Sequence, residues 1–263
     1  MKLDNVLLVY TRPAAKEYKS TLKIVERTLR KNKISFELAD RDGLSKKLFR
    51  NREFIIAVGG DGTFLRTAQF VGNQIILGVN ADVRSKEGFF MNADKLDFEE
   101  KLRLILDGRH KLKLFPRLEA LINDRKLDTL ALNEFFIGPV KSYHAAKYII
   151  SANGMSERQK SSGILVSTPA GSYAWSKACT EKTLPIDSSG FQFVVREPYE
   201  GKVFRNYRLV YGKLNKTDSI TIKSEMRSGI LIADSVGKEH SFGNGRKAVI
   251  KMSKSRLRSI WFN

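Results

Sequence analysis

Three short segments of the sequence combine residue types that can act on a phosphorylated ligand. The first is Gly59-Gly60-Asp61-Gly62-Thr63, which follows the apolar run Phe54 to Val58 and precedes a helical pattern. Glycines let phosphate oxygens or a sugar approach the backbone closely, and the free N–H groups at a helix start favour an anion there. Asp61 can take a proton from a hydroxyl nucleophile or stand behind a magnesium ion. A glycine-rich turn in which Asp61 only caps a helix fits the same residues, so both interpretations stay open at this segment.

The second segment is a strand-like run, Gly163 to Ser167, that enters the turn Thr168-Pro169-Ala170-Gly171-Ser172. Ser172 is the expected N-cap of a short helix. Its N–H groups and hydroxyls suit a second phosphate or a ribose, and Tyr173 and Trp175 offer flat faces to a base. A strand, turn and helix with core aromatics needs no ligand, so this segment alone is also ambiguous.

The third segment places Asn133 and Glu134 inside the otherwise apolar run 131–137. Buried polar side chains must find hydrogen-bond partners, and a carboxylate beside a carboxamide suits the vicinal hydroxyls of a ribose. An edge position facing water would explain the pair equally well. A weaker feature is Asp234, which closes the apolar run Ile230 to Ala233.

The elements that must position the first segment alternate between strand and helix patterns. Tyr18, Leu22, Val25 and Leu29 lie at the 4-3-4 spacing of one helical face. The expected strands are 6–10, 34–38, 54–58 and 74–80, and the expected helices are 15–31, 63–71 and 96–106. Such short units predict an α/β domain over residues 1–110, with a mostly parallel sheet covered on both faces.

The other two segments lie in a part of the chain with a different pattern, which begins after Phe115-Pro116. Residues 117–122 and 127–137 flank the turn Asn123-Asp124, which predicts a hairpin. Further short strands are expected at 146–152, 163–167, 191–196, 207–211, 219–223 and 230–233, with a helix near 172–180. We therefore expect a β-rich, antiparallel sandwich-like domain over 111–245, and a tail, 246–263, that returns to the N-terminal domain.

Composition limits the class of protein. The net charge is +19, from 47 Lys and Arg against 28 Asp and Glu in 263 residues, which favours anionic ligands. Charge alone does not separate a generally basic surface from a dedicated polyanion site. The single cysteine, Cys179, fits a reducing compartment, and no thiol cluster predicts a protein-held metal. The apolar runs are far shorter than the ~20 residues of a membrane span, and no signal peptide is predicted. We therefore expect a cytoplasmic protein.

In this order, the three segments resemble the NAD kinase family, which carries a Gly-Gly-Asp-Gly-Thr turn, an Asn-Glu pair and a Thr-Pro-x-Gly-Ser/Thr loop. The first motif also occurs in diacylglycerol, sphingosine and phosphofructokinases; the combination is more specific, and the resemblance covers roughly residues 50–240. It implies transfer of the terminal phosphate of ATP, with Mg²⁺ or another divalent cation, or of polyphosphate, to the 2′-hydroxyl of the adenosine ribose of NAD. Asp61 would activate that hydroxyl. The dinucleotide-binding residues that the resemblance implies, chiefly in the β-rich domain, are Gly60, Gly62, Thr63, Phe89, Asn133, Glu134, Lys160, Ser162, Ser172, Tyr173, Ala174, Trp175, Ala178 and Asp234.

Departures from the family pattern bear on substrate preference. Lys160-Ser161-Ser162-Gly163 stands where many members have Arg-x-Asp-Gly, Trp175 replaces a usual Tyr, and Ser235 replaces a usual Gly or His. With the segment 79–85, these features resemble a divergent branch that includes mitochondrial NAD kinases, and they leave the choice between NAD and NADH open.

The resemblance also implies a homodimer or homotetramer in which a neighbouring subunit completes the site. No membrane or nucleic-acid partner is expected. Two alternatives remain: a lipid or sugar kinase that shares the glycine motif, and a basic nucleic-acid-binding protein on a degenerate kinase scaffold.

Overall fold

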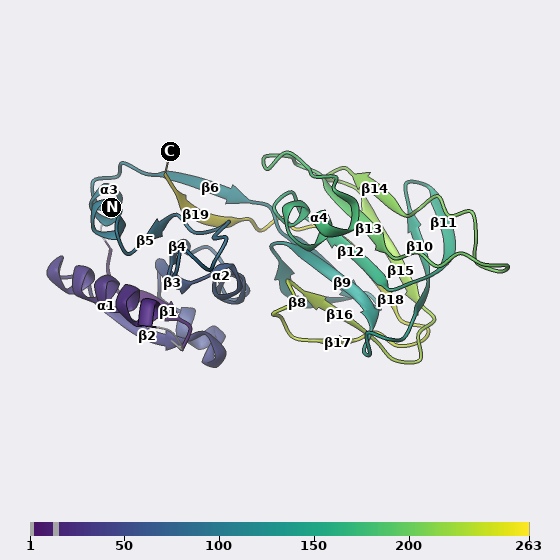
Figure 1. Cartoon of the computed structure of the whole chain (residues 1–263), viewed down its shortest axis with the longest axis horizontal. Coiled ribbons are helices and arrows are strands. Elements are labelled where there is room, and N and C mark those ends of the chain that lie inside the picture. Colours follow the sequence, from purple (N-terminus) through teal and green to yellow (C-terminus); the bar gives the residue numbers. More distant parts are fainter. Residues whose placement is uncertain (1–2, 13–15, 263) are drawn as a thin grey trace. The chain divides into compact units, whose positions relative to one another are not determined.

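The computed structural model describes residues 3–12 and 16–262. The expected helical residue 15 and the first two residues of the chain lie outside this description. The chain forms two compact units (Figure 1), one comprising residues up to Leu114 and again from Leu257, and the other comprising Phe115–Arg256. The units divide at 114/115 and 256/257, whereas the sequence analysis placed boundaries at 110 and 245. Each unit is described by itself.

The first unit is an α/β domain built on a largely parallel sheet with the strand order β2-β1-β3-β4-β19-β6, and β5 pairs with β4. Strands β1, β2, β3, β4, β5 and β19 run parallel. Its elements are β1 (Val6–Tyr10), α1 (Lys16–Lys31), β2 (Phe36–Asp40), the 3₁₀ helices η1 (Arg41–Gly43) and η2 (Lys46–Phe49), β3 (Phe54–Gly59), α2 (Asp61–Ala68), β4 (Ile75–Asn80), β5 (Ala93–Asp94), α3 (Phe98–Leu106), β6 (Lys111–Phe115) and β19 (Leu257–Trp261).

The apolar stripe on α1 explains why this helix packs on the sheet. Val25 and Leu29 are fully buried in one cluster with Val6, Leu8 and residues of β3 and β4. Thr21 also donates from Oγ1 to the carbonyl oxygen of Ala81 at 3.0 Å, just beyond β4. This packing holds the carboxyl ends of the parallel strands at one edge of the sheet, where ligands bind in open α/β folds.

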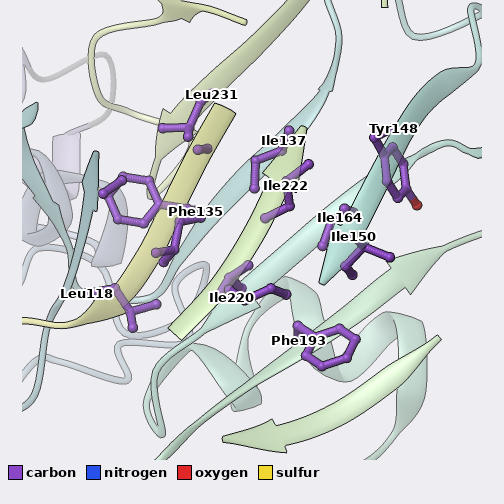
Figure 2. Packing of buried hydrophobic residues seen from close by; sticks show 14 of the residues in the cluster. Leu118, Phe135, Ile137, Tyr148, Ile150, Ile164, Phe193, Ile220, Ile222 and Leu231 are labelled. Atoms are coloured by element: carbon purple, nitrogen blue, oxygen red, sulfur yellow. The ribbon is translucent and has the colours of Figure 1, made fainter. Parts of the chain in front are cut away.

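The second unit consists of two antiparallel sheets, with strand orders β11-β10-β15-β18-β7-β8 and β14-β13-β12-β9-β16-β17. Its elements are β7 (Leu118–Ile122), β8 (Arg125–Ala131), β9 (Glu134–Pro139), β10 (Ala146–Ala152), β11 (Met155–Ser161), β12 (Gly163–Ser167), η3 (Gly171–Tyr173), α4 (Trp175–Thr180), β13 (Phe191–Arg196), β14 (Tyr211–Leu214), β15 (Ser219–Ser224), β16 (Gly229–Ala233), β17 (His240–Ser241) and β18 (Lys247–Met252). Side chains from both sheets form one core (Figure 2), for example Ile150 and Ile222 from the first and Phe135, Ile164 and Phe193 from the second. The expected sandwich is confirmed.

The hairpin at Asn123-Asp124 is also confirmed, because β7 and β8 pair across it. Both turn residues have positive φ, 48° and 62°, as a type I′ turn requires. The expected single strand 127–137 is wrong. It is broken at 132–133, where the chain passes from β8 in one sheet to β9 in the other. The strand expected at 207–211 lies instead at Tyr211–Leu214, and β11, β18 and β19 were not predicted.

Among the described residues, no helix is both long and apolar enough to cross a membrane.

Candidate functional site

The glycine turn lies at the carboxyl end of β3, and it passes directly into α2. This helix begins at Asp61 rather than at the expected Thr63, and its N-cap is Gly60, which has no side chain to cap it. Gly59 leaves room for the Thr63 side chain, which a Cβ at that position would displace. The backbone of Thr63 donates to the carbonyl oxygen of Gly60 at 2.9 Å. Glycine is required at position 59 because the Thr63 side chain occupies the space that a Cβ there would need.

The Asp61 carboxylate is held by a different part of the chain. Its two oxygens accept hydrogen bonds from the backbone N–H groups of Phe89, at 3.0 Å, and Phe90, at 2.9 Å. The interpretation of Asp61 as a simple helix cap is therefore wrong. Because each carboxylate oxygen accepts more than one hydrogen bond, Asp61 keeps the capacity to take a hydroxyl proton.

Phe89 and Phe90 follow β4, and their rings differ in exposure. Phe90 is buried and stacks on Phe64 with 5.0 Å between ring centroids, whereas the Phe89 ring is 38% exposed and contacts Phe90 edge-on. The structure thus brings together Asp61, Gly60, Gly62, Thr63 and the expected aromatic, Phe89.

In the second unit, Asp234 organises the break between β8 and β9. It follows β16 in a left-handed conformation, with φ of 54°. Its carboxylate accepts hydrogen bonds from the backbone N–H groups of Leu132 at 3.0 Å, Asn133 at 2.7 Å and Glu134 at 3.2 Å. Asp234 is buried, so its carboxylate acts on the backbone that carries the Asn-Glu pair.

Three buried polar atoms beside this break have no hydrogen-bond partner among the described residues: Asn133 Oδ1, Glu134 Oε2 and Ser167 Oγ. Ser167 lies opposite Glu134 in the pairing of β12 with β9. Unsatisfied buried polar groups are costly, and they require an explanation such as a ligand. Two acceptors and a hydroxyl suit a ligand that carries hydroxyl groups. Ser167 was not predicted as a site residue, although it is the polar residue that ends an apolar strand.

Burial also changes the acidity of this cluster. It raises the pKa of Glu134 to about 8, and the neighbouring Asp234 adds to the shift. Burial raises the pKa of Asp234 as well, while the three backbone N–H donors act against that change. The Arg117 guanidinium is also buried, which lowers its pKa to about 10, and Asp234 opposes this lowering. Arg117 was not predicted, because one Arg after a Pro has no distinguishing pattern.

The Thr168 loop packs directly on the Asn133 backbone. Thr168 donates from Oγ1 to the carbonyl oxygen of Leu132 at 2.6 Å and accepts from the Gly171 N–H at 3.0 Å. Any side chain at Gly171 would collide with the Asn133 carbonyl group. The loop and the Asn-Glu pair therefore form one rigid arrangement.

Ser172 is not the N-cap that the sequence analysis expected. Helix α4 begins at Trp175 with Ala174 as its N-cap. The Ser172 hydroxyl is buried, donates to the carbonyl oxygen of Pro169 at 2.7 Å and accepts from the Leu184 N–H at 2.9 Å. Its hydroxyl therefore fixes the loop from within.

The flat side chains after the loop differ in their surroundings. Tyr173 is 41% exposed, whereas Trp175 is half-buried, with its ring centroid 5.2 Å from that of Phe136. The Arg196 guanidinium lies 4.5 Å above the Trp175 ring. Ala174 is half-buried and Ala178 is exposed. Tyr173 thus presents the more accessible ring.

Lys160 and Ser162 lie away from the Asn-Glu pair in the same chain. Ser162 precedes β12 and donates to Glu197, at the opposite end of this strand from Ser167. Lys160 lies with its ammonium 4.0 Å over the Tyr199 ring. It also lines a cavity of about 950 Å³ beside Pro139, at the far end of β9 from Glu134. This cavity is therefore not at the cluster of unsatisfied polar atoms.

Within the described parts of the chain, no three His, Cys, Asp or Glu side chains come together in a way that could hold a metal ion.

Comparison with known proteins gives a consistent result. Residues 9–110 match the family model of the ATP-NAD kinase N-terminal domain. A probable NADH kinase of Oryza sativa is 26% identical over 97% of the chain and 84% of the relative. An NAD kinase of Saccharolobus islandicus is 31% identical over 63% of the chain, which spans only 60% of that relative.

Two solved structures share the fold across both units. An NAD kinase from Archaeoglobus fulgidus in complex with ATP has a TM-score of 0.78 and 22% identity, over 98% of this chain and 93% of that one. Yeast NADH kinase in complex with NADH has a TM-score of 0.82 and 17% identity, over 99% of this chain and 84% of that one. The domain with the glycine turn therefore matches the NAD kinase family model, and the chain is similar along both units to proteins named NAD kinase or NADH kinase.

Proposed function

We propose that the protein transfers the terminal phosphate of ATP to the 2′-hydroxyl of the adenosine ribose of NAD, which yields NADP and ADP. The observation that carries this proposal is the Asp61 carboxylate, which two backbone N–H groups hold at a glycine turn where a parallel strand enters a helix. Phosphoryl transfer depends mainly on positioning and charge stabilisation, and a rigid carboxylate at an anion-binding turn supplies both.

In the proposed reaction, Asp61 takes the proton of the 2′-hydroxyl as the ribose oxygen forms a bond to the terminal phosphorus. The bond from this phosphorus to the bridging oxygen breaks, and ADP leaves with the electron pair. The N–H groups at the start of α2 face the charge on the transferred group. The unsatisfied atoms of Asn133, Glu134 and Ser167 accept from and donate to ribose hydroxyls, and Tyr173 lies against the base.

The described residues form no cluster that fits a dedicated metal ion. We propose that Mg²⁺ arrives with ATP, bound by its phosphates, where it neutralises part of their charge.

We also propose a homodimer or homotetramer in the cytoplasm. Lys160 and Ser162 lie at the opposite ends of strands from the Asn-Glu pair of their own chain. Strands rise by about 3.3 Å per residue, so these two residues lie several residues along the strands from that pair. They instead contact the dinucleotide bound by a neighbouring subunit.

The test is NADP formation by the purified protein with Mg²⁺, either NAD or NADH, and either ATP or polyphosphate. Asp61→Asn should lower kcat by roughly 10²- to 10⁴-fold, the usual contribution of a general base, while calorimetry finds NAD affinity little changed. Asp107→Asn, the same change at an exposed position, should have no effect. Near wild-type turnover by folded Asp61→Asn would exclude the assigned role. Phosphorylation of a diacylglycerol, sphingoid base or hexose phosphate, with none of NAD, would favour the lipid or sugar kinase alternative.

A further inference from the structure

Two cationic side chains, those of Lys86 and Arg41, flank the glycine turn in the first unit, and the reaction proposed for Asp61 uses neither of them. The methylene chain of Lys86 lies over Gly60: a Cβ at Gly60 would be 3.1 Å from Lys86 Cδ and 3.3 Å from Cγ. On the other glycine, the position of a Cβ at Gly62 is 3.8 Å from Arg41 Nη1. The Lys86 side chain and the Arg41 guanidinium thus lie beside the backbone that faces the donor in the proposed reaction.

Arg41 is placed there by the end of strand β2. It is the first residue of η1, which packs against α2. Asp40 caps η1 by accepting from the Asp42 N–H at 3.0 Å, and it also accepts from Arg12. The ion pair of Arg41 recorded in the described residues is with the adjacent, exposed Asp42, with 3.4 Å between Nε and Oδ1, and the charge of Arg41 also helps to lower the pKa of the neighbouring Asp40. An exposed pair of this kind is weak, so the Arg41 guanidinium remains available to an anion.

Lys86 is placed by a braced loop after strand β4. Asp82 accepts from the Arg84 N–H at 3.2 Å and from the Ser85 hydroxyl at 2.6 Å, and its carbonyl oxygen accepts from the Lys86 N–H at 3.1 Å. The next turn uses Gly88, at φ of 72°, where a Cβ would be only 2.6 Å from Asn80 Nδ2. Within residues 3–12 and 16–262, no carboxylate lies within ion-pair distance of the Lys86 ammonium.

The same loop then delivers the Phe89 and Phe90 N–H groups to Asp61. One segment, residues 81–90, therefore fixes the direction of the Asp61 carboxylate and lays the Lys86 side chain over the neighbouring glycine. A phosphoryl group at this turn would meet Lys86 on one side and Arg41 on another, with the N–H groups of α2 between them. Lysine supplies a compact charge and arginine a planar set of donors, and both are suited to phosphate oxygens.

We propose that Lys86 and Arg41 bind the phosphate chain of the phosphoryl donor across the glycine turn. This inference rests on the proposed kinase function and names the donor-binding side chains of the same site. The chemistry recognised is a row of linked phosphates, which both ATP and inorganic polyphosphate provide. Cations at the transferred group stabilise charge that develops in the transition state.

Steady-state kinetics with ATP, and separately with polyphosphate, test the proposal. Lys86→Ala and Arg41→Ala should each lower kcat/KM for the donor by about 10²-fold or more, while KM for NAD changes by less than about threefold. Lys86→Arg, which keeps the charge, should recover much of the lost activity. The matched control is Lys23→Ala, which removes the same charge from an exposed position on α1. Equal losses for both donors identify the phosphates as the recognised group, and a loss confined to ATP would overturn the assignment to the phosphate chain.

A direct binding measurement separates this proposal from the proposed function. Calorimetry with ATP and Mg²⁺, without NAD, should show at least tenfold weaker binding to Lys86→Ala than to the wild type or to Lys23→Ala. If the wild type binds ATP and Lys86→Ala binds it at least tenfold more weakly, but no NADP forms, the proposed function fails. The assignment of Lys86 and Arg41 to phosphate binding then still stands. The assignment would be overturned if Lys86→Ala and Arg41→Ala had the same donor kinetics and the same ATP affinity as Lys23→Ala. The assignment would also be overturned if Lys86→Arg did not restore the activity lost in Lys86→Ala, or if Lys86→Ala lost NAD affinity as strongly as ATP affinity. Either result would indicate that the substitution disrupts the loop that carries Lys86.

Discussion

Glu134 and Asp234 are two carboxyl groups buried at the same break between β8 and β9. Two like charges in a site of low polarity repel each other, so their proton affinities are coupled. Asp234 accepts three backbone N–H groups, which favours its charged form, whereas Glu134 Oε2 has no partner among the described residues. We infer that Glu134 holds its proton more tightly than Asp234 and that it is protonated at neutral pH before the ligand binds.

This protonation makes stability depend on pH in a definite direction. The pKa of Glu134 is about 8 in the folded chain against 4.5 as its ordinary value. Between these values the folded state keeps a proton that the unfolded state has lost, so the free energy of unfolding falls as pH rises. The slope is at most about 1.4 kcal/mol per pH unit for this group, and little further change from it is expected above the folded pKa.

The isosteric change Glu134→Gln removes this proton equilibrium and tests the prediction. Denaturant unfolding of both proteins from pH 5 to pH 8 should show that the wild type loses stability relative to Glu134→Gln as pH rises. Glu181→Gln, at an exposed position at the end of α4, should follow the wild type. Parallel curves for wild type and Glu134→Gln would mean that Glu134 is already ionised in the folded chain.

At the residue scale, the sequence predicted which residues carry the chemistry better than it predicted how they are held. Asp61 stands out in a glycine turn, but its hydrogen-bond donors lie 28 and 29 residues further along the chain. Likewise, Asp234 reaches backbone about 100 residues before it. Such contacts depend on tertiary packing, and no local spacing encodes them.

At the scale of elements, β19 has an unusual place. This strand comes from the end of the chain, yet it lies between β4 and β6 in the sheet of the first unit. Ile260 is fully buried there, in the same cluster as Ile75 and Leu77 of β4. The first unit, which carries Asp61, therefore depends on residues that follow the whole second unit in sequence.

Ile260→Ala should destabilise the first unit by about 2–5 kcal/mol, the usual cost of truncating a buried Ile. Hydrogen exchange locates the effect: backbone amides of β4 should exchange faster, while those of β12 in the second unit keep their protection. Lys254→Ala, at an exposed position, is the control and should change neither. Faster exchange spread equally over both units would contradict an effect confined to one unit.

Element patterns in the sequence predicted the buried strands well, for example Ala146–Ala152 and Phe191–Arg196, because alternating or continuous apolar residues mark them directly. The break at 132–133 was missed because residues 131–137 are apolar on both sides of Asn133 and Glu134. The transfer of the chain between two sheets leaves no gap in that pattern. β11, with the sequence MSERQKS, has almost no apolar residues and is a strand only because β10 pairs with it.

At the scale of the whole molecule, the net charge of +19 acts on every ligand that the proposed reaction requires. A basic protein raises the local concentration of nucleotides and speeds their association. Screening shortens the reach of this field from about 10 Å at 0.1 M salt to about 3 Å at 1 M. The effect should be larger for ATP than for NAD, because ATP carries more negative charge.

We therefore expect KM for ATP to rise by a factor on the order of 10 between low salt and ~0.5 M KCl, KM for NAD to rise less, and kcat to change little. As a control, a neutral osmolyte replaces KCl at equal osmolality, and both KM values should then stay unchanged. This control separates charge screening from crowding or viscosity. Because the control variant Lys23→Ala removes only one charge of many, its salt dependence should match that of the wild type. A KM for ATP that is flat across this range would show that the excess charge lies too far from the donor site to act, and that only nearby groups such as Lys86 and Arg41 attract the donor.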